Sequence, residues 1–217
     1  KWGIHNTLKY VDGIIYDSMD ARNETEKYFP RAKEKQSHVS YIIIDDMPTV
    51  PIVDGQYFLY MGNLEKRKGT DLLLDAYWEY VSRGGERELY LAGKVREKEI
   101  ENQLEEVQNK TKKIHYLGYI TEEEKWKRYA ECGCFLFPSM AEGFGMPVIE
   151  ALNYGKPVIA SELDVFSELE GDLLNYYEQG ENRQEALHNL VNIMNQFKIP
   201  DRTECQKVLQ RYEKENL

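Results

Sequence analysis

Two glutamates eight residues apart enclose a pair of glycines in the segment "AEGFGMPVIEALNYGKPVIAS". Glu142 stands directly before Gly143, and Glu150 follows Gly145 by five residues. Glycine takes backbone conformations that are closed to other residues, and it lets a ligand approach the main chain closely. The spacing therefore predicts a loop whose backbone amides meet a phosphate or a sugar hydroxyl, with carboxylates nearby to accept hydroxyl groups.

A helix is predicted to begin directly behind this loop, because Pro147 suits a first helical turn, where its missing N–H costs nothing. Glu142 lies in the loop, near the reacting end of a ligand. Glu150 lies one turn inside the helix, where a carboxylate is able to accept both hydroxyls of a ribose. On the residues alone, a surface acid for Glu142 and an acid favoured by the helix dipole for Glu150 stay open. The amides left to face a ligand belong to Gly143, Phe144, Gly145 and Met146.

A second loop carries positive charge. The segment "GNLEKRKG", from Gly62 to Gly69, places three cations ahead of a predicted helix. The N-terminus of a helix has unpaired amides and the positive end of the dipole, so an anion fits there. Lys68, directly before Gly69, is the cation best placed to meet that anion. A solvated turn lysine remains the alternative.

Other nucleotide and hydrolase motifs are excluded by spacing. The chain has no G-x-x-x-x-G-K-[ST], its "GFG" is followed by "MPV" and completes no G-x-G-x-x-G, and no G-x-S-x-G occurs. Three cysteines and four histidines show no metal-ligand spacing. We expect reduced thiols, with Cys132 and Cys134 as small buried residues next to a strand, and no metal site.

The composition limits the class of protein. The 217 residues carry a formal net charge of −10, which argues against a nucleic-acid partner, since phosphate backbones bind basic surfaces. No apolar run approaches the roughly 18 residues of a membrane span, and no secretory leader is visible. Residue 1 is Lys1, inside a helical pattern. We therefore expect a soluble fragment of a longer protein.

Strand-like and helical patterns alternate along the chain, which predicts a doubly wound parallel α/β fold, Rossmann-like, with helices on both faces of the sheet. In such sheets ligands bind at the carboxyl ends of the strands. Prolines near residues 48–51 suggest a boundary between residues 1–50 and residues 51–217. The strands are expected at 13–18, 39–44, 57–62, 88–93, 114–119, 134–139, 157–161 and 173–177. The helices are expected at 70–81, 95–110, from Thr121 through Ala130, 184–197 and 202–215.

The segment "EGFGMPVIEALNYGKPVIAS" resembles the E-x7-E region of retaining glycosyltransferases of family 4, also called glycosyl transferases group 1. "FLYMGNLEKRKGTDLLLDAY" is similar to the strand, basic loop and helix of the same family, and "ELYLAGK", "IHYLGYITEEEKWKRYAECGCFLFPS" and "VFSEL" match in the family's order. The likeness covers about residues 51–197. It implies the C-terminal, donor-binding half of a two-domain GT-B enzyme, with residues 1–50 as the end of the acceptor-side domain and a linker.

The resemblance also implies roles for single residues. Lys68 would neutralise the donor diphosphate, and Glu142 would bind hydroxyls of the transferred sugar; these two are the expected catalytic residues. Glu150 would hold the ribose, and the backbone around Tyr119 and Ile120 would face the base. The remaining donor-binding residues expected are Gly62, Asn63, Arg67, Gly143, Phe144, Gly145 and Met146.

One residue departs from the family pattern. Many members have an arginine where this chain has Asn63, and an amide replaces neither the charge nor the fork of a guanidinium. Either Arg67 or Lys66 compensates, or diphosphate binding is weaker. The alternative is therefore a degenerate glycosyltransferase-like binding or partner subunit; an epimerase of a related two-domain fold is a further rival.

The resemblance implies a UDP-, GDP- or dTDP-sugar as donor, a glycan or lipid-linked acceptor bound through the missing N-terminal domain, and no metal or other cofactor. We expect a cytoplasmic enzyme of polysaccharide biosynthesis. Peripheral association of the full-length protein with the inner face of the membrane stays open. The fragment alone is expected to bind donor without turnover, because the acceptor side of the cleft belongs to the missing half.

Overall fold

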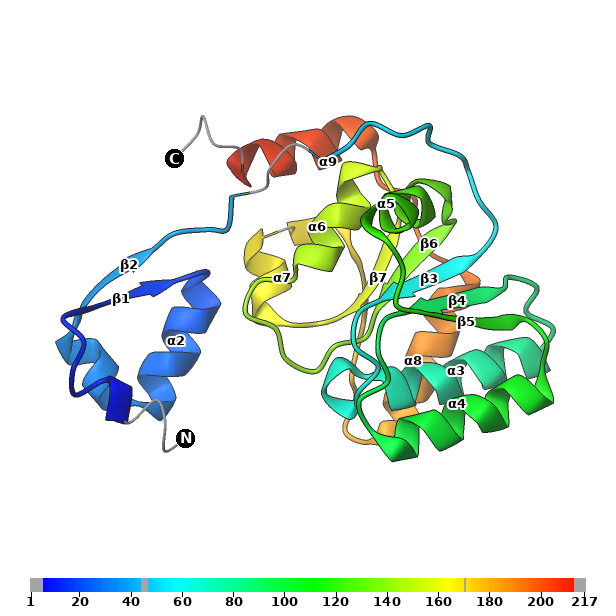
Figure 1. The fold of residues 1–217 in the computed structure, drawn as a ribbon, viewed down its shortest axis with the longest axis horizontal. Coiled ribbons are helices and arrows are strands. Elements are labelled where there is room, and N and C mark those ends of the chain that lie inside the picture. The colour runs from blue at the N-terminus through cyan, green and yellow to red at the C-terminus, as the bar shows by residue number, and fades with distance from the viewer. Residues whose placement is uncertain (1–5, 44–46, 170, 213–217) are drawn as a thin grey trace.

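The computed structural model describes residues 6–43, 47–169 and 171–212. Its main element is a sheet of six parallel strands in the order β5-β4-β3-β6-β7-β8 (Figure 1). The strands are β3 (Phe58–Met61), β4 (Leu89–Ala92), β5 (Ile114–Gly118), β6 (Cys134–Phe137), β7 (Val158–Ser161) and β8 (Asn175–Tyr177).

Helices cover both faces of this sheet, because side chains along a strand alternate between the faces. Phe58 and Tyr60 pack into one apolar layer with α3 (Thr70–Ser82), α4 (Lys98–Lys110) and α8 (Arg183–Asn195). Leu59 and Met61 pack into the other layer with α5 (Glu122–Glu131), α6 (Met146–Asn153) and α9 (Arg202–Leu209). Figure 1 shows the two helical layers on opposite sides of the strands. The predicted doubly wound fold is confirmed.

The chain reverses its direction of travel across the sheet between β3 and β6. From β3 it proceeds to β4 and β5 on one side, and it then returns to form β6 on the other side of β3. Connections leave the two central strands in opposite directions, which opens a crevice at their carboxyl ends. The loop that contains Gly143 and Gly145, called the glycine loop, follows β6, and the loop from Gly62 to Gly69, called the basic loop, follows β3. Both loops therefore begin at this crevice.

Residues 6–40 form a small unit of their own. β1 (Gly13–Tyr16) pairs in parallel with β2 (Gln36–Val39), and α2 (Met19–Tyr28) and a short helix η1 (Pro30–Glu34) connect them. The strand expected at 39–44 is wrong over residues 40–43: the register pairs Tyr16 with Val39, and Ser40 and Tyr41 lie beyond the end of β1. Residue 44 lies outside the described residues. The apolar run that suggested a strand instead includes Tyr41, whose ring contacts Phe144 and Tyr212.

Residues 47–56 connect the small unit to the large sheet without forming a helix or a strand. They lie against the side of the molecule formed by α5 and α6. The Tyr154 hydroxyl donates to the Pro48 carbonyl at 2.8 Å, and the buried Lys156 ammonium donates to the Val53 carbonyl at 2.6 Å. Lys156 belongs to the segment "GKPVIAS", so this part of the motif holds the connecting segment in place.

Two helix boundaries differ from the prediction. The helix expected from residue 95 begins at Lys98, because Val95 instead forms a parallel bridge with Leu64. The helix expected over 202–215 ends at Leu209 and continues as the short helix η4 (Gln210–Tyr212); residues 213–215 lie outside the described residues. A short helix α7 (Asp164–Leu169), which the patterns did not predict, follows β7.

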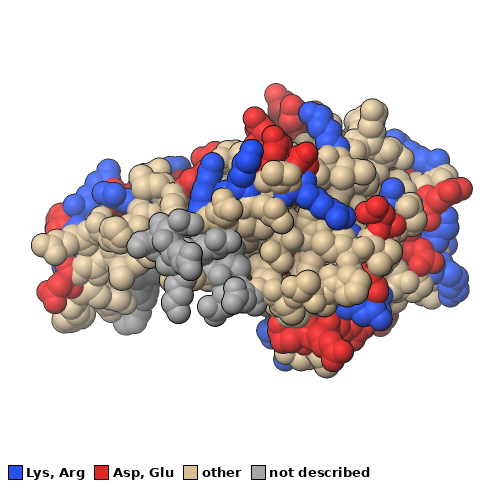
Figure 2. Space-filling view, turned by 90° about the horizontal axis from the view of Figure 1, so that it is seen from above, with Lys and Arg blue, Asp and Glu red and all other residues tan. Residues whose placement is uncertain are grey.

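Figure 2 shows how charged side chains are distributed over one face of the molecule. On the face shown in Figure 2, acidic and basic side chains gather in separate clusters, and no continuous basic strip crosses it. A nucleic-acid backbone is bound by such a strip, so this face agrees with the net charge of −10. No helix in the described part of the chain has both the length and the apolar character needed to cross a bilayer.

Candidate functional site

The two loops at the crevice contact each other closely. Gly69, between η2 (Lys66–Lys68) and α3, has a left-handed backbone with φ 66°, and a Cβ placed there would lie 1.9 Å from the Pro138 carbonyl oxygen. The Met140 N–H donates to the Arg67 carbonyl at 3.0 Å, and the Arg67 guanidinium donates to the Ala141 carbonyl at 3.1 Å. The basic loop therefore lies directly on the segment that leads into the glycine loop.

This contact brings Lys68 and Glu142 together. The Lys68 ammonium lies 2.5 Å from the Glu142 carboxylate, and the two side chains are only 18% and 9% exposed. The ammonium also lies 5.7 Å from the centre of the Phe137 ring. A cation that has lost most of its water is a strong partner for an anion. The pair thus places one positive and one negative group, both largely desolvated, at the crevice between β3 and β6.

The glycine loop has the predicted position, but its two glycines act differently. Gly145 is left-handed with φ 90° and precedes the first residue of α6, whose second residue is Pro147. Gly143 is not left-handed, contrary to expectation. Its lack of a side chain leaves room for Asp17: a Cβ at residue 143 would lie 3.0 Å from the Asp17 Oδ2 atom, a tight contact that a small shift of the Asp17 carboxylate would relieve. Asp17 follows β1, so the small unit contacts the glycine loop directly.

The loop presents its main chain rather than its aromatic side chain. Phe144 is buried, and its ring contacts Tyr41 and Tyr212. Among the described residues, no protein acceptor contacts the backbone N–H groups of Phe144, Gly145 and Met146. These groups stand at the N-terminus of α6, where the helix dipole also favours an anion. The arrangement is chemically suited to bind phosphate oxygens.

Glu150 lies one turn further along α6, as predicted, and its side chain is 13% exposed. The Lys125 ammonium of α5 donates to this carboxylate at 3.2 Å, contacts Glu122 at 2.8 Å, and lies 3.8 Å from the centre of the Trp126 ring. Burial and the nearby Glu150 carboxylate raise the pKa of the Tyr129 hydroxyl. Lys125 was not identified from the sequence, because no local pattern relates it to a residue of another helix.

A pocket of about 340 Å³ opens between the carboxyl ends of β3, β4 and β5. Glu150 is not among its lining residues, but Lys125, which contacts Glu150, is. Tyr119 and Ile120 line it, as do Gly62 and Asn63. Three basic side chains also line it: Lys94, Arg96 and Lys125. Its partly apolar walls and convergent polar groups are typical of a site for a small organic ligand.

The cations proposed to compensate for Asn63 lie elsewhere. Lys66 is paired with Glu99, and Arg67 is paired with Glu65 at 2.9 Å. Neither side chain lines the pocket that contains Asn63. Asn63 itself is exposed, and its carbonyl accepts a hydrogen bond of 2.7 Å from the buried Tyr60 hydroxyl. The positive charge closest to this pocket is therefore that of Lys94, Arg96 and Lys125, of which the sequence patterns singled out none.

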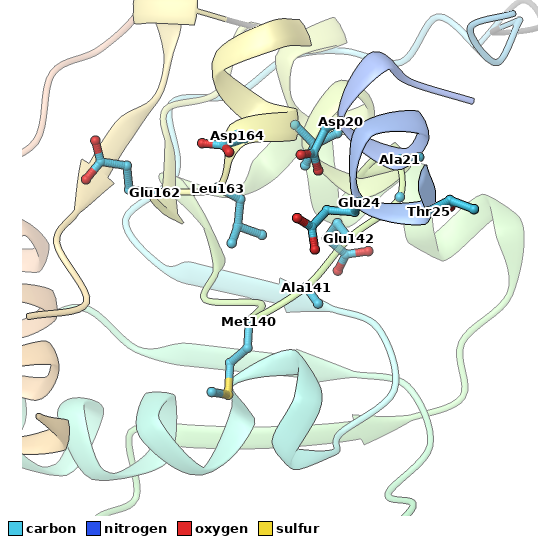
Figure 3. Close-up of a pocket in the computed structure, with 12 residues that line it drawn as sticks. Asp20, Ala21, Glu24, Thr25, Met140, Ala141, Glu142, Glu162, Leu163 and Asp164 are labelled. Atoms are coloured by element: carbon cyan, nitrogen blue, oxygen red, sulfur yellow. The ribbon is translucent and has the colours of Figure 1, made fainter. Parts of the chain in front are cut away.

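A second pocket, of about 480 Å³, adjoins Glu142 on the side of the small unit (Figure 3). Three separate segments line it: α2, the glycine loop, and the residues that follow β7. Burial, and then the negative charges of Asp164, Glu24 and Glu168, raise the pKa of Asp20 in this pocket. Lysine and arginine are absent from the described lining. The acidic residues of the lining are Asp20, Glu24, Glu142, Glu162 and Asp164.

No cluster of three or more histidine, cysteine or carboxylate side chains in the described ranges could hold a metal ion. Cys132, Cys134 and Cys205 are free and buried, as expected of small apolar residues. Burial raises the pKa of Cys132 to about 12 and that of Cys205 to about 11, so neither thiol is reactive at neutral pH.

Comparison with known proteins agrees with this arrangement. The family model described as glycosyl transferases group 1 matches residues 45–205. O-antigen chain mannosyltransferase B of Escherichia coli is 37% identical over 118 residues, which are 54% of this chain and 31% of that protein. Alpha-1,3/1,6-mannosyltransferase ALG2 of Dictyostelium discoideum is 32% identical over 173 residues, 70% of this chain and 40% of that protein. The chain thus spans less than half the length of these curated relatives.

Solved structures share the fold. Anabaena Alr3699/HepE in complex with UDP-glucose superposes with a TM-score of 0.75 at 19% identity, over 98% of this chain and 63% of that one. The pneumococcal O-GlcNAc transferase GtfA in complex with UDP and GlcNAc gives a TM-score of 0.72 at 16% identity, over 98% and 44%. The fold is that of one half of a GT-B glycosyltransferase. With three quarters of its sequence matched by the family model, the chain belongs to the glycosyl transferases group 1 family.

Proposed function

We propose that this chain forms the donor-binding part of a retaining glycosyltransferase of family 4, which moves a sugar from a nucleotide diphosphate sugar to a glycan or lipid-linked acceptor. The observation that carries the proposal is the crevice between β3 and β6, where the Lys68 ammonium and the open amides of the α6 N-terminus stand together. Such groups stabilise the negative charge that develops on a departing diphosphate. Residues 51–217 would be the donor domain, and residues 1–50 the end of the acceptor-side domain with its linker.

The two pockets suit the two ends of a nucleotide sugar. The base would occupy the pocket lined by Tyr119 and Ile120. The ribose would lie at its Lys125 side, where the Glu150 carboxylate that contacts Lys125 would accept the ribose hydroxyls. The transferred sugar would occupy the pocket beside Glu142, whose lining carboxylates accept hydrogen bonds from hydroxyl groups and repel an anion. We therefore infer a neutral hexose. Relatives named mannosyltransferases and neighbours solved with UDP support a test of both GDP- and UDP-sugars.

The ribose assignment is tested with one variant and two ligands. The nucleoside diphosphate that raises the melting temperature of the full-length protein most is chosen first, since a ligand that binds the folded state stabilises it. We expect Glu150→Ala to weaken binding of this ligand about 5- to 100-fold, the cost of about 1–3 kcal/mol for a lost charged hydrogen-bond partner. The 2′,3′-dideoxy analogue of this ligand lacks the ribose hydroxyls, so it should bind the unmodified protein and Glu150→Ala equally.

Glu122→Ala controls for the release of Lys125 alone, because Glu122 also pairs with Lys125 but itself lines the pocket. A loss caused only by release of Lys125 would appear in both variants. Equal losses for the two ligands on Glu150→Ala would remove Glu150 from the ribose site. Absence of nucleoside diphosphate binding by the unmodified protein would refute the proposed function as a whole.

Asn63 is the observation that favours a second candidate, a glycosyltransferase-like binding subunit without activity. The pocket that contains Asn63 is also lined by Lys94, Arg96 and Lys125. These cations could bind a donor even where the missing arginine abolishes catalysis. The full-length protein is assayed for hydrolysis and transfer with a panel of nucleotide sugars. If the unmodified protein binds a donor tightly without turnover, and Asn63→Arg restores turnover, the chain belongs to this second class. Turnover by the unmodified protein would assign it to the enzymes.

A further inference from the structure

We propose that Ser18 is a positioning residue for the donor-binding loop and that Glu168 holds Ser18 in place; this inference rests on the proposed function. Ser18 lies at the N-terminus of α2 and has no exposed surface. Its hydroxyl donates to the Gly143 carbonyl at 2.8 Å and accepts a hydrogen bond of 2.9 Å from the Ala21 N–H. One hydroxyl thus caps a helix of the small unit and bonds the loop of the large one.

The bond to Gly143 sets the direction of the next amide. A trans peptide is planar, and its carbonyl and N–H point in opposite directions. Because the Gly143 carbonyl points to Ser18, the N–H of Phe144 points away from Ser18. No protein acceptor in the described part of the chain contacts this N–H. Ser18 therefore orients an amide that is available to a ligand, although its own side chain is buried against protein.

Glu168 of α7 fixes the helix that carries Ser18. Its Oε1 atom accepts a hydrogen bond from the Met19 N–H, and its Oε2 atom accepts one from the Asp20 N–H, both at 2.8 Å. The Ala21 N–H donates to Ser18. The side chains of Glu168 and Ser18 thus accept the first three backbone N–H groups of α2. The carboxylate also meets the positive end of the helix dipole. A shift of α2 away from α7 would leave these groups unpaired.

Tyr41 completes the arrangement from the other end of the small unit. Its hydroxyl donates to Glu168 Oε1 at 2.9 Å, and its ring centre lies 6.4 Å from that of Phe144. Ser18 therefore holds the Gly143 carbonyl, and Tyr41 contacts the ring of the next residue, Phe144. Ser18 and Tyr41 both precede residue 47, so the shape of the anion-binding loop depends on the small unit as well as on its own sheet.

The test compares a diphosphate with its nucleoside in the full-length protein. We expect Ser18→Ala to weaken nucleoside diphosphate binding about 3- to 10-fold, the effect of one lost hydrogen bond, and to leave affinity for the corresponding nucleoside unchanged, because only the phosphates reach the loop. In steady-state assays Ser18→Ala should raise the KM for the donor. The conservative Ser18→Thr, which keeps the hydroxyl, should have the KM of the unmodified protein. Glu168→Gln loses the charge and places an amide NH2, a donor, against one of the two backbone N–H groups that Glu168 accepts, so it should also weaken diphosphate binding and leave the nucleoside unchanged.

Ser167→Ala, next to Glu168 on the exposed side of α7, serves as control and should match the unmodified protein. The inference is overturned if Ser18→Ala binds the diphosphate as tightly as the unmodified protein, or if diphosphate and nucleoside lose affinity equally. Should Ser18→Ala not fold, Glu168→Gln decides by the same two affinities. Failure of the unmodified protein to bind any nucleoside diphosphate would instead refute the proposed function.

Discussion

At the scale of single residues, the ion pair between Lys68 and Glu142 determines the charge of the site before a ligand arrives. The ammonium already has a carboxylate at 2.5 Å, and both groups are largely removed from water. In the proposed function, an arriving diphosphate would compete with Glu142 for the same cation. Once the diphosphate had taken Lys68, Glu142 would be free to accept hydrogen bonds from the hydroxyls of the sugar. The same residue would then oppose binding of the nucleotide and recognise the sugar.

This exchange predicts an unusual effect of mutation. We expect Glu142→Gln to strengthen nucleoside diphosphate binding about 3- to 10-fold, because removing the competing charge is worth roughly 1 kcal/mol at this partly buried site. The same variant should lose most of its turnover with a nucleotide sugar. Titration calorimetry with the nucleoside diphosphate measures the first effect.

Two further variants bracket the result. Lys68→Met should weaken binding of the nucleoside diphosphate. Glu65→Gln, which removes the charged partner of the exposed Arg67, should change that affinity little. Weaker diphosphate binding by Glu142→Gln would contradict competition between Glu142 and the ligand.

At the scale of elements, the contact between the basic loop and β6 depends on a single glycine. Gly69 ends η2 and precedes α3, and its left-handed backbone turns the chain from the loop into the helix. The absence of a side chain also lets the Pro138 carbonyl approach the Gly69 Cα atom. The loop is braced further by Thr70, which accepts from the Glu65 N–H and donates to the Tyr60 hydroxyl. These contacts fix the position of Lys68.

A matched pair of glycine variants separates the two demands at this position. Gly69 and Gly118 share φ 66°, but a Cβ at residue 118 would meet no atom within 4 Å. We expect Gly118→Ala to lower the free energy of unfolding by about 1–2 kcal/mol, the cost of a left-handed L-residue. Gly69→Ala should lose at least about twice as much, since the Pro138 carbonyl must also move. Urea unfolding followed by circular dichroism measures both values; equal losses would show that the contact relaxes without cost.

At the scale of the whole molecule, the carboxyl end of the small sheet faces the crevice of the large one. The N-terminus of α2 lies against the glycine loop and α7, and the acidic pocket lies between them (Figure 3). Carboxylates from both units therefore face one another: Asp20 and Glu24 come from α2, and Asp164 lies at the start of α7. Hydrogen bonds from Ser18 and Tyr41 hold together two surfaces whose charges repel.

This repulsion predicts how stability changes with pH. The pKa of Asp20 is raised by burial and by Asp164, Glu24 and Glu168, so ionisation of Asp20 is less favourable in the folded than in the unfolded chain. The folded state is unaffected well below the ordinary pKa of 3.8 and loses stability as the pH rises through the raised value. We expect Asp20→Asn to gain stability relative to the unmodified protein between pH 4 and pH 7.

Thermal unfolding at several pH values measures this difference. Asp12→Asn, at an exposed acid of the same unit that does not line the acidic pocket, is the comparison variant. Added salt should reduce the advantage of Asp20→Asn, because it screens the facing charges. An advantage of Asp20→Asn that is constant from pH 4 to pH 7 would show that the facing carboxylates do not repel Asp20.

Much of the large sheet follows from local patterns. Strands such as Phe58–Met61 are apolar on both faces and lie between amphipathic helices, which specifies buried parallel strands. Thr121, where the helix was expected to start, caps α5 by accepting the Glu124 N–H, and Pro147 marks the start of α6. The E-x7-E spacing put Glu142 in a loop and Glu150 one turn into a helix, because both positions depend only on where α6 begins.

Tertiary structure decided which residues meet. The run at 39–44 has strand propensity, yet β2 pairs at 36–39, because the register follows β1 and Tyr41 packs on Phe144 and Tyr212. Lys68 meets Glu142, Lys125 meets Glu150, and Ser18 meets Gly143 across 74, 25 and 125 residues of chain. Local spacing relates residues a few positions apart within one element. Contacts between elements depend instead on the order of strands in the sheet and on the docking of the small unit.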